Sequence, residues 1–445
     1  MRPLQELQIA NRNFGKYNAI YAKSQEGMHV LKIETIVHID PQRPHVYANA
    51  VRQIVTQGAV VSPVRFDIDS TNHCTNTCIG CFSQRQRKSI PGEIAYESLQ
   101  TTLDLLDQRG VTLVRLTGGG DPTEYSNFSA LAKYIGERFI TFLETHGDFL
   151  SREDISEAVA RYIDRPRISF DSGDNASRLI VHAPQTQASC VDSTRNYDNL
   201  LRGLEKTMKR AKVLYQQGDR ETQMLTGATF VIKPQNYRSL PQFLNDMDAL
   251  GISWVALRKD IHHRSFAPHP EMEHFIDEEL QRAQKLGFIL QMPYRHSSLP
   301  RMEGFSECWT TKLRGNIFAD NTYHACVLDR NMGFRQKDYG FTQIGQINPQ
   351  TSIEDLIGIS GEPKHVQVAK KAPKECTFCV DVDPNGLFDN MASIIRKDPN
   401  AKFGEARVLK GDTSRIISQS DDIISISLSS EDHKRFEEQK PVPLN

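Results

Sequence analysis

The sequence predicts an α/β fold: a partial parallel barrel followed by a small domain of mixed α+β structure. From residue 64 to about 292, short β-branched segments alternate with amphipathic segments of helical length. This alternation is the pattern of repeated βα units, and six or more of them imply a parallel barrel, whole or partial. After about residue 295 the alternation stops and cysteines return, which indicates a second domain.

The barrel elements follow in a regular order. The predicted strands are short and apolar, as buried parallel strands are, and comprise 64–69, 111–117, 138–145, 166–172, 224–233, 252–258 and 288–292. The predicted helices between them are 95–109, 128–136, 151–163, 196–216, 237–250 and 271–286. Ser151, with an acid three residues later at Asp154, predicts a capping box at the start of one helix.

The remaining chain divides around the barrel. Residues 17–39 predict two strands about a turn at Gly27, Tyr47–Thr56 predicts a helix, and Ile423–Leu428 predicts a strand. The predicted parts are an N-terminal extension or small subdomain at 1–63, the barrel at 64–295, a cysteine-containing domain at 296–395 and a tail at 396–445. The N-terminal part could bind a leader peptide, although an extension that packs on the barrel is the simpler interpretation.

Composition and charge exclude several classes of partner. Hydrophobic residues make up 38% and charged residues 24% of the chain, as in globular proteins. The chain has 54 basic and 55 acidic residues, so its net charge is close to zero. This balance favours neither nucleic acid nor an anionic membrane as a partner. No apolar run approaches the ~18 residues of a membrane span, and the N-terminus lacks the apolar core of a secretory signal. The expected location is therefore the cytoplasm.

The most informative motif is a group of three cysteines directly after the first barrel strand. Cys74, Cys78 and Cys81 have C-x3-C-x2-C spacing. Three thiolates in one loop can hold three irons of a [4Fe–4S] cube and leave the fourth iron open to a small molecule. Zinc is the alternative metal, but a closed zinc site needs four ligands, and this loop offers only His73 as a fourth.

A glycine-rich segment follows the second predicted strand. Gly118, Gly119 and Gly120 would let backbone approach a ligand closely, and the carboxylate of Asp121 can accept hydrogen bonds from an ammonium group. Together with the cysteine loop one βα unit earlier, this segment resembles the radical S-adenosylmethionine (radical SAM) superfamily. There a Gly-Gly-Glu-Pro segment binds the amino group of SAM, and here Asp replaces Glu.

The resemblance implies further cofactor contacts at other strand ends. Ser169 and Asp171 become candidates for SAM ribose or substrate contacts, and Arg258 for the SAM carboxylate. Asp171 could instead cap its own loop, and Arg258 could be a solvated surface residue. The family usually has an aromatic residue just before the third cysteine. This chain has Gly80 there, so Phe82 is the candidate for the apolar contact.

The C-terminal cysteines resemble SPASM and twitch domains, which carry auxiliary clusters. Cys308 precedes a predicted β-hairpin that turns at Asp320–Asn321 and ends at Cys326, and residues 344–347 and 351–356 predict the strand and helix that follow. The four cysteines sufficient for a complete auxiliary [4Fe–4S] site are Cys308, Cys326, Cys376 and Cys379. A structural zinc ion with the same ligands is the alternative.

Cys190 belongs to neither cysteine group. It lies in a predicted loop after the fourth strand, on the side where the barrel would have its active site. A thiol there could give a hydrogen atom to a substrate radical, as in radical SAM peptide epimerases. A free cysteine is more often a small buried hydrophobe.

The family resemblance implies an enzyme that cleaves SAM to methionine and a 5′-deoxyadenosyl radical, which then removes hydrogen from a substrate C–H bond. The expected cofactors are the SAM-binding [4Fe–4S] cluster, a second [4Fe–4S] cluster and SAM, with flavodoxin or ferredoxin as electron donor. The expected substrate is a ribosomal peptide or a natural product. The alternatives are a twitch-type dehydrogenase of small sugars or aminocyclitols, and a non-enzymatic iron–sulfur or zinc interaction module.

Overall fold

The computed structural model describes sixteen stretches of the chain, and they form two units that are treated separately below. The described residues are 18–25, 27–34, 44–58, 63–81, 83–89, 92–182, 196–259, 270–286, 290–291, 305–326, 342–347, 364–376, 382–410, 415–419, 424–428 and 442–444. The first unit contains 65–297 and 315–356, and the second contains 10–64, 298–314 and 357–445.

The first unit is built on a sheet whose central strands are all parallel. Seven consecutive strands pair in chain order, β3-β4-β5-β6-β7-β8-β9, as repeated βα units require. Their bounds are β3 Arg65–Asp69, β4 Leu113–Thr117, β5 Ile140–Thr145, β6 Arg165–Ser169, β7 Gly227–Ile232, β8 Trp254–Lys259 and β9 Leu290–Gln291. The predicted α/β barrel architecture is confirmed.

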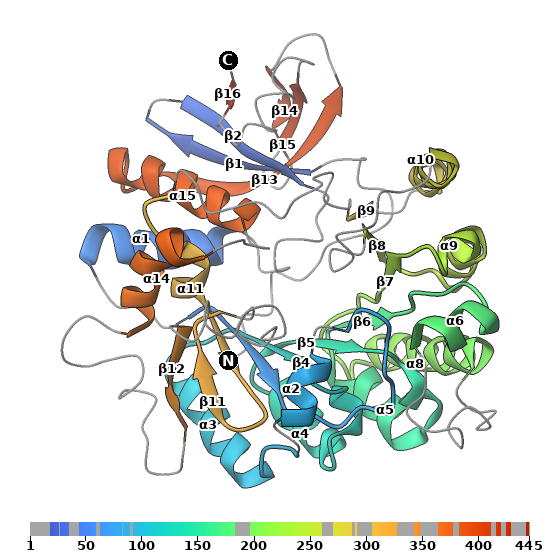
Figure 1. Cartoon of the computed structure of the whole chain (residues 1–445). Helices are drawn as coiled ribbons and strands as arrows, with labels where there is room; N and C mark the ends of the chain where they lie inside the picture. The colour runs from blue at the N-terminus through green and yellow to red at the C-terminus, as the bar shows by residue number, and fades with distance from the viewer. Residues whose placement is uncertain are drawn as a thin grey trace. The chain divides into compact units, whose positions relative to one another are not determined.

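Helices follow these strands and cover one face of the sheet, as the ribbon shows for α4, α5 and α8 (Figure 1). Alternate strand residues such as Ile68, Leu116 and Ile168 face them and are fully buried. The helix bounds are α2 Gln84–Ser89, α3 Tyr96–Gln108, α4 Phe128–Gly136, α5 Glu153–Tyr162, α6 Asn175–His182, α8 Tyr197–Gln217, α9 Leu240–Leu250 and α10 Pro270–Lys285. Because the other face of each strand is free of these helices, it can carry polar residues.

One predicted cap is wrong. Helix α5 begins at Glu153 with Arg152 at its N-cap, and no side chain caps it. Ser151 instead ends the preceding 3₁₀ turn, Asp148–Ser151, where its hydroxyl donates to the carbonyl of Asp148 over 3.2 Å. The hydroxyl of Ser151 is therefore bonded within the turn, whereas the sequence pattern predicts that it caps the helix.

The predicted hairpin extends the same sheet on its other side. Strands β10 (Arg314–Ile317), β11 (Thr322–His324) and β12 (Gln343–Gln346) are antiparallel to one another, and β10 adjoins β3. Asn321 has φ of 66°, the left-handed conformation expected for this turn. The predicted helix at 351–356 lies outside the described residues.

The second unit combines both ends of the chain in one sheet. Its order is β14-β15-β13-β1-β2-β16, so β13 lies between the N-terminal hairpin and the C-terminal strands. The strand bounds are β1 Asn18–Ser24, β2 Gly27–Glu34, β13 Lys402–Lys410, β14 Arg415–Gln419, β15 Ile424–Leu428 and β16 Val442–Leu444. Thus the segments treated as an extension and a tail in the sequence form one sheet.

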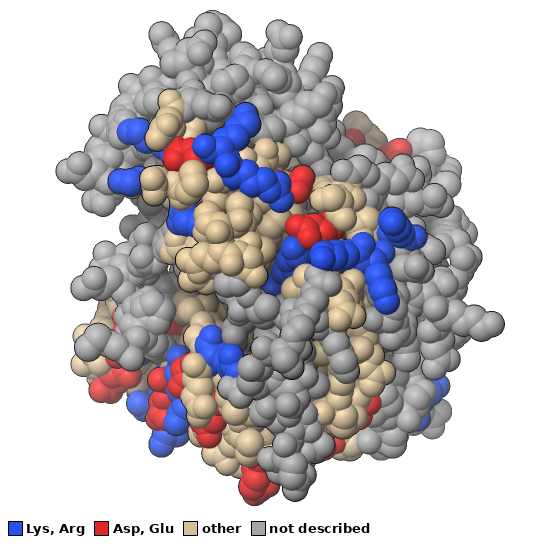
Figure 2. Space-filling view, turned by 90° about the vertical axis from the view of Figure 1, so that its left-hand side faces the viewer, with Lys and Arg blue, Asp and Glu red and all other residues tan. Residues whose placement is uncertain are grey.

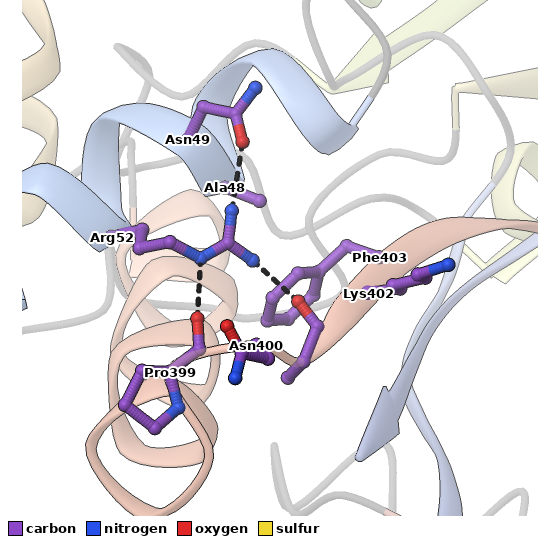
Figure 3. Close-up of a pocket in the computed structure, with 8 residues that line it drawn as sticks. Ala48, Asn49, Arg52, Pro399, Asn400, Lys402 and Phe403 are labelled. Carbon is purple, nitrogen blue, oxygen red and sulfur yellow. Dashed lines mark hydrogen bonds between the residues drawn. The ribbon is translucent and has the colours of Figure 1, made fainter.

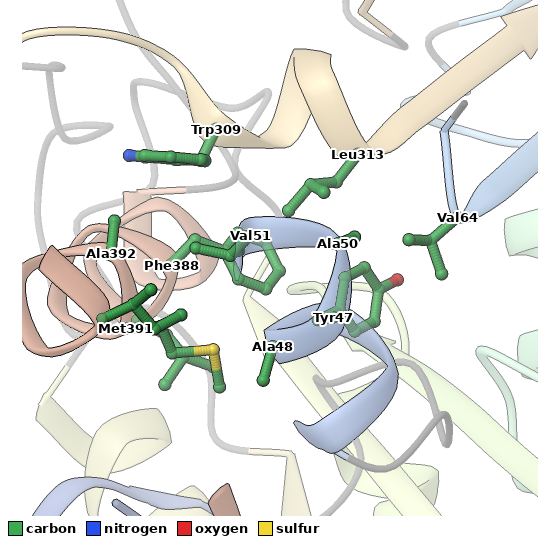
Figure 4. Close-up of a cluster of buried hydrophobic side chains, with 12 residues drawn as sticks. Tyr47, Ala48, Ala50, Val51, Val64, Trp309, Leu313, Phe388, Met391 and Ala392 are labelled. Atoms are coloured by element: carbon green, nitrogen blue, oxygen red, sulfur yellow. The ribbon is translucent and has the colours of Figure 1, made fainter. Parts of the chain in front are cut away.

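Helices from three separate segments make the core of the second unit. The ring of Tyr47 packs against Phe388 with ring centroids 5.0 Å apart, and Trp309 and Leu313 join the same buried cluster (Figure 4). The helices are α1 Pro44–Gln57, α11 Trp309–Leu313, α14 Lys364–Glu375 and α15 Val382–Lys397. Burial of these large side chains stabilises the unit by roughly 1.5–3 kcal/mol each.

A pocket of about 430 Å³ lies between α1 and the start of β13. The guanidinium of Arg52 crosses it, donating to the carbonyl oxygens of Pro399 over 2.8 Å and Ala401 over 2.5 Å and to Asn49 Oδ1 over 2.9 Å (Figure 3). The guanidinium of Arg52 therefore joins α1 to the turn before β13.

The described surface has mixed charge. Basic and acidic side chains lie beside one another on the face seen in Figure 2, in keeping with the near balance of the whole sequence. Among the described helices, none is long and apolar enough to cross a membrane.

Candidate metal centre

The three clustered cysteines lie in the loop that leaves the carboxyl end of β3. Cys74, Cys78 and Cys81 are each half-buried, and none of them forms a disulfide with another described cysteine. The loop turns at the last two, where the N–H of Cys81 donates to the carbonyl of Cys78 over 3.1 Å. It is also tied to helix α6, because the N–H of Ile79 donates to the carbonyl of Val181 over 2.9 Å.

Each of these thiols has a nitrogen-bearing neighbour. His182 Nδ1 lies 3.3 Å from Cys78 Sγ, and Arg87 Nη2 lies 4.0 Å from Cys81 Sγ. Cys74 is grouped with His146 and Glu124, whose ligand atoms all lie within 4.8 Å of one another. Hydrogen bonds to cluster sulfurs tune reduction potential, so the guanidinium of Arg87 beside Cys81 suits an iron–sulfur site.

The electrostatics of the loop favour a bound cation. Burial, followed by the neighbouring Cys81 and Cys74, raises the pKa of Cys78 well above its usual value. Burial also raises the pKa of Cys81, although Arg87 opposes the shift. Thiolates at Cys78 and Cys81 are thus costly here until a metal supplies positive charge. Three closely placed soft thiols fit an iron–sulfur cluster with one iron left open.

The glycine segment after β4 packs directly on the cysteine loop. The N–H of Gly120 donates to the carbonyl of Thr71 over 3.0 Å. A Cβ on Gly119 would lie 1.7 Å from Asn72 Oδ1, and one on Gly120 would lie 1.9 Å from the carbonyl oxygen of His73. These glycines are therefore required for the close approach of the two loops, a role that the sequence motif alone does not reveal.

Asp121 is buried and accepts several hydrogen bonds from within the chain. Its carboxylate accepts from the N–H of Thr123 over 2.9 Å, the hydroxyl of Thr145 over 2.8 Å and the N–H of His146 over 2.7 Å. It thereby joins the glycine segment to the end of β5. Binding of the SAM amino group at residues 118–121 stays a prediction.

A buried polar cluster beneath the cysteine loop is absent from the sequence analysis. Glu124 Oε1 accepts from both the N–H and the hydroxyl of Thr75, over 2.7 and 3.0 Å. Asp148 accepts from Asn76 Nδ2 over 3.1 Å and forms an ion pair with Arg178. Both carboxylates therefore hold the backbone or side chains between the first two cysteines. Only their positions after the ends of the next two strands, β4 and β5, could have indicated them.

His146 lies at the centre of this cluster. Burial alone would lower its pKa, but Asp121 and Asp148, together with hydrogen bonds to Cys74 and Glu124, raise it well above the usual value. In contrast, burial and then Arg178 lower the pKa of His182 to about 3. Because the carbonyl of Phe170 can only accept, His182 Nε2 carries the hydrogen of their 2.8 Å contact, and Nδ1 faces Cys78.

The remaining barrel candidates have different surroundings. Asp171 has φ of 44°, and its carboxylate accepts from the N–H of Val231 in β7 over 2.6 Å rather than from its own loop. Ser169 ends β6 and Arg258 lies near the end of β8, both half-buried. Their contacts with SAM stay predictions.

The auxiliary site is not brought together within one unit. Cys308 and Cys376 belong to the second unit and Cys326 to the first, while Cys379 lies outside the described residues. Phe82 and Cys190 also lie outside them. Their assigned roles stay predictions.

The arrangement of the first unit decides its fold class. A cysteine loop follows the first of the consecutive parallel strands, and a glycine segment after the second strand packs against that loop. The first unit therefore has an α/β fold, in which a parallel sheet carries the cysteine loop at the end of its first strand.

Comparison with known proteins gives weak similarities. No family model and no curated protein matches the chain. Among solved structures, SuiB of Streptococcus suis bound to precursor peptide SuiA has 13% identity and a TM-score of 0.49, over 68% of this chain and 66% of that one. The match thus spans just under two thirds of SuiB.

Two further solved structures are similar at the same low level. Native anSMEcpe with bound AdoMet has 14% identity and a TM-score of 0.46, over 71% of this chain and 86% of that one. BtrN in complex with AdoMet and 2-DOIA has 12% identity and a TM-score of 0.35, over 71% and 89%. At such identities a likeness says nothing about the substrate.

Proposed function

We propose that the protein is a radical SAM enzyme. The observation that carries this proposal is the cysteine loop at the end of β3, held against the glycine segment by close backbone packing. When bound, the cluster would supply an electron that cleaves SAM to methionine and a 5′-deoxyadenosyl radical, which abstracts hydrogen from a substrate C–H bond. An interaction module would need no such second loop beside its metal ligands.

The chain's own residues have distinct parts in this proposal. Cys74, Cys78 and Cys81 hold the cluster, and Gly118–Asp121 receives the methionine part of SAM. Ser169 contacts the ribose, Arg258 pairs with the SAM carboxylate, and Phe82 contacts the adenine. The polar cluster of Glu124, His146, Asp148 and Arg178 keeps the cysteine loop in place.

The substrate is proposed to be a ribosomal peptide or natural product, which is crosslinked, epimerised or oxidised. A dehydrogenase of small sugars or aminocyclitols is the second candidate. In an epimerase, Cys190 would give the hydrogen atom. Flavodoxin or ferredoxin would supply the electron in the cytoplasm, where thiols stay reduced.

The second cysteine group is proposed to hold an auxiliary cluster. Iron, sulfide and zinc content after anaerobic reconstitution tests both sites. About eight irons per chain, four for each cube, are expected. About four irons with one zinc would make Cys308, Cys326, Cys376 and Cys379 a structural zinc site, and no iron would overturn the whole proposal.

The Cys78→Ala variant tests the reaction. Removing one of the three thiolates leaves one iron of the cluster without its cysteine ligand. The formation of 5′-deoxyadenosine from SAM and dithionite should therefore fall to background. Thr77→Ala, which changes a neighbour in the same loop, serves as the control and should retain it. Continued SAM cleavage by the Cys78→Ala variant would contradict the assignment of Cys78 as a cluster ligand.

A further inference from the structure

Three side chains of the kinds that bind metal ions converge beside the first cysteine. Cys74 Sγ, a carboxylate oxygen of Glu124 and a ring nitrogen of His146 all lie within 4.8 Å of one another. They come from three loops, which follow β3, β4 and β5. These strands are parallel and adjacent, so their carboxyl ends lie at the same edge of the sheet and bring the three loops together.

The spacing of these atoms already suits tetrahedral coordination. His146 Nε2 lies 3.3 Å from Glu124 Oε1 and 3.3 Å from Asp121 Oδ2. Around a zinc ion with metal–nitrogen and metal–oxygen distances of about 2.0–2.2 Å, neighbouring ligand atoms of a tetrahedron lie roughly 3.3–3.6 Å apart. Glu124 and His146 can therefore bind one ion with little movement.

Both of these ligands are held in orientation by further contacts. On the other side of the imidazole of His146, Nδ1 lies 3.3 Å from Asp148 Oδ2, and Asp148 is paired with Arg178. Glu124 Oε1 accepts from the N–H and the hydroxyl of Thr75, over 2.7 and 3.0 Å. Metal-binding histidines usually donate from their second nitrogen to a carboxylate or carbonyl, and metal-binding carboxylates are themselves hydrogen-bonded. The outer contacts of a metal site are thus present as well as its ligands.

The charges around His146 favour a cation at Nε2. Among the described residues, Asp121 and Glu124 form ion pairs with His146 alone. Their other hydrogen bonds come from neutral hydroxyl and backbone N–H groups. A divalent ion bound to Nε2 takes the place of the hydrogen there and interacts with the same two carboxylates.

The ligands also differ in kind from those of an iron–sulfur cluster. One thiolate, one imidazole and one carboxylate are all usual ligands of zinc, and three protein ligands leave the fourth position to a water molecule. Cys74 and Glu124 keep some exposed surface, whereas His146 is buried. An ion can therefore reach the site from the side of the cysteine loop.

We propose that Cys74, Glu124 and His146 form a mononuclear zinc site in the cluster-free protein. The thiol proton of Cys74 and the Nε2 proton of His146 pass to solvent when the ion binds. Cys74 belongs both to this site and to the proposed cluster site, so zinc bound here blocks cluster assembly. The zinc site itself is independent of the proposed function, and only its effect on assembly rests on that function.

The test uses the full-length protein, freed of metal with a chelator, and Co²⁺ as the spectroscopic probe of a zinc site. We expect one Co²⁺ per chain, with the visible bands of tetrahedral coordination, the near-ultraviolet band of a single thiolate, and displacement by Zn²⁺. Three variants should each weaken Co²⁺ binding about tenfold or more: Cys74→Ser, Glu124→Gln and His146→Gln. Even the outer contacts of metal ligands contribute about 10–100-fold in affinity.

Two controls locate the ion. Cys78→Ala removes a proposed cluster ligand but none of this site, and should bind Co²⁺ as wild type does. Glu153→Gln, at an exposed position on α5, should also leave binding unchanged. Equal losses in Cys74→Ser and Cys78→Ala, or the band of several thiolates, would place the ion on the cysteine loop alone and overturn the proposal. Absence of Co²⁺ binding would overturn it as well.

Reconstitution with iron and sulfide separates this inference from the proposed function. One equivalent of Zn²⁺ added beforehand should lower the iron content of wild type and have less effect on Glu124→Gln. An unchanged iron content in wild type would refute the block of cluster assembly by zinc. Wild type that takes up no iron even without zinc would refute the proposed function, while the Co²⁺ titration still decides the zinc site.

Discussion

At the scale of single residues, the cysteine loop depends on side chains that belong to no motif. Glu124 lies just beyond the glycine segment, and its Oε1 accepts two hydrogen bonds from Thr75, next to the first cysteine. Glu124 is also 3.3 Å from His146 Nε2. One carboxylate oxygen therefore connects the two loops and the end of β5.

Replacing Glu124 tests this connection. Glu124→Ala leaves the N–H and hydroxyl of the half-buried Thr75 without their acceptor, and an unpaired donor costs at most about 1–3 kcal/mol when it is buried. We expect a loss of that order in the free energy of unfolding of the cluster-free protein, measured with urea, and lower iron retention. Glu137→Ala, at an exposed site after α4, is the matched control. Equal stability of both variants would show that Glu124 is dispensable for the loop.

The residue scale also shows why the sequence predicts only part of the site. The spacing of Cys74, Cys78 and Cys81 is a local pattern, so the sequence alone predicts that they form a site. Glu124, His146 and Arg178 are single polar residues, and only the register of β4, β5 and α6 brings them together. A lone histidine or glutamate has no spacing to reveal it.

At the scale of elements, helix α6 is the support of the cysteine loop. Its Arg178 is 3% exposed, forms an ion pair with Asp148 and donates to the carbonyl of His146 over 3.0 Å. Its last residue, His182, contacts Cys78. The helix thus fixes both the loop and the polar cluster.

Arg178→Ala should be severely destabilising, because it removes the guanidinium from the buried carboxylate of Asp148 and leaves only the imidazole of His146 beside it. Breaking a buried pair in this way costs about 3–5 kcal/mol. Arg152→Ala breaks a pair whose side chains are 55% and 54% exposed, and should cost about 1 kcal/mol or less. Urea unfolding of both variants measures the contrast, and similar losses would contradict the role given to α6.

Most barrel elements could be predicted because their signals are local. Alternating apolar segments indicated β3 to β9, and every helix predicted between them is present. The capping box at Ser151 failed, since the hydroxyl is taken by the turn of Asp148. The pairing of β1 with β13 could not be predicted, because nothing in either segment identifies a partner about 380 residues away.

At the scale of the whole molecule, the ion pairs of Glu144 with Arg115 and Arg167 on β4 and β6 make stability depend on pH. The folded pKa of Glu144, about 2, lies below the usual glutamate value of about 4.3. Ionised Glu144 therefore contributes its full stability above about pH 5, and this contribution is lost as pH falls towards 2. Arginines remain charged throughout this range.

The Glu144→Gln variant isolates this contribution, because it mimics the protonated side chain. We expect the difference in unfolding free energy between wild type and variant to be largest above pH 5 and to shrink as pH falls from 5 to 3. Urea unfolding across this range measures it, with Glu153→Gln, an exposed residue of α5, as control. A difference that is constant with pH would mean that the ion pairs of Glu144 add nothing to stability.

The mixed sheet of the second unit has a consequence for synthesis of the protein. Strand β1 cannot meet β13 until the whole first unit has left the ribosome, because Ser24 and Lys402 are separated by nearly the entire chain. At typical elongation rates of about 5–20 residues per second, the N-terminal hairpin waits roughly 20 to 75 s for its partner. During that interval its hydrogen-bonding edge is uncovered and open to chaperones, or to the same hairpin on a neighbouring nascent chain.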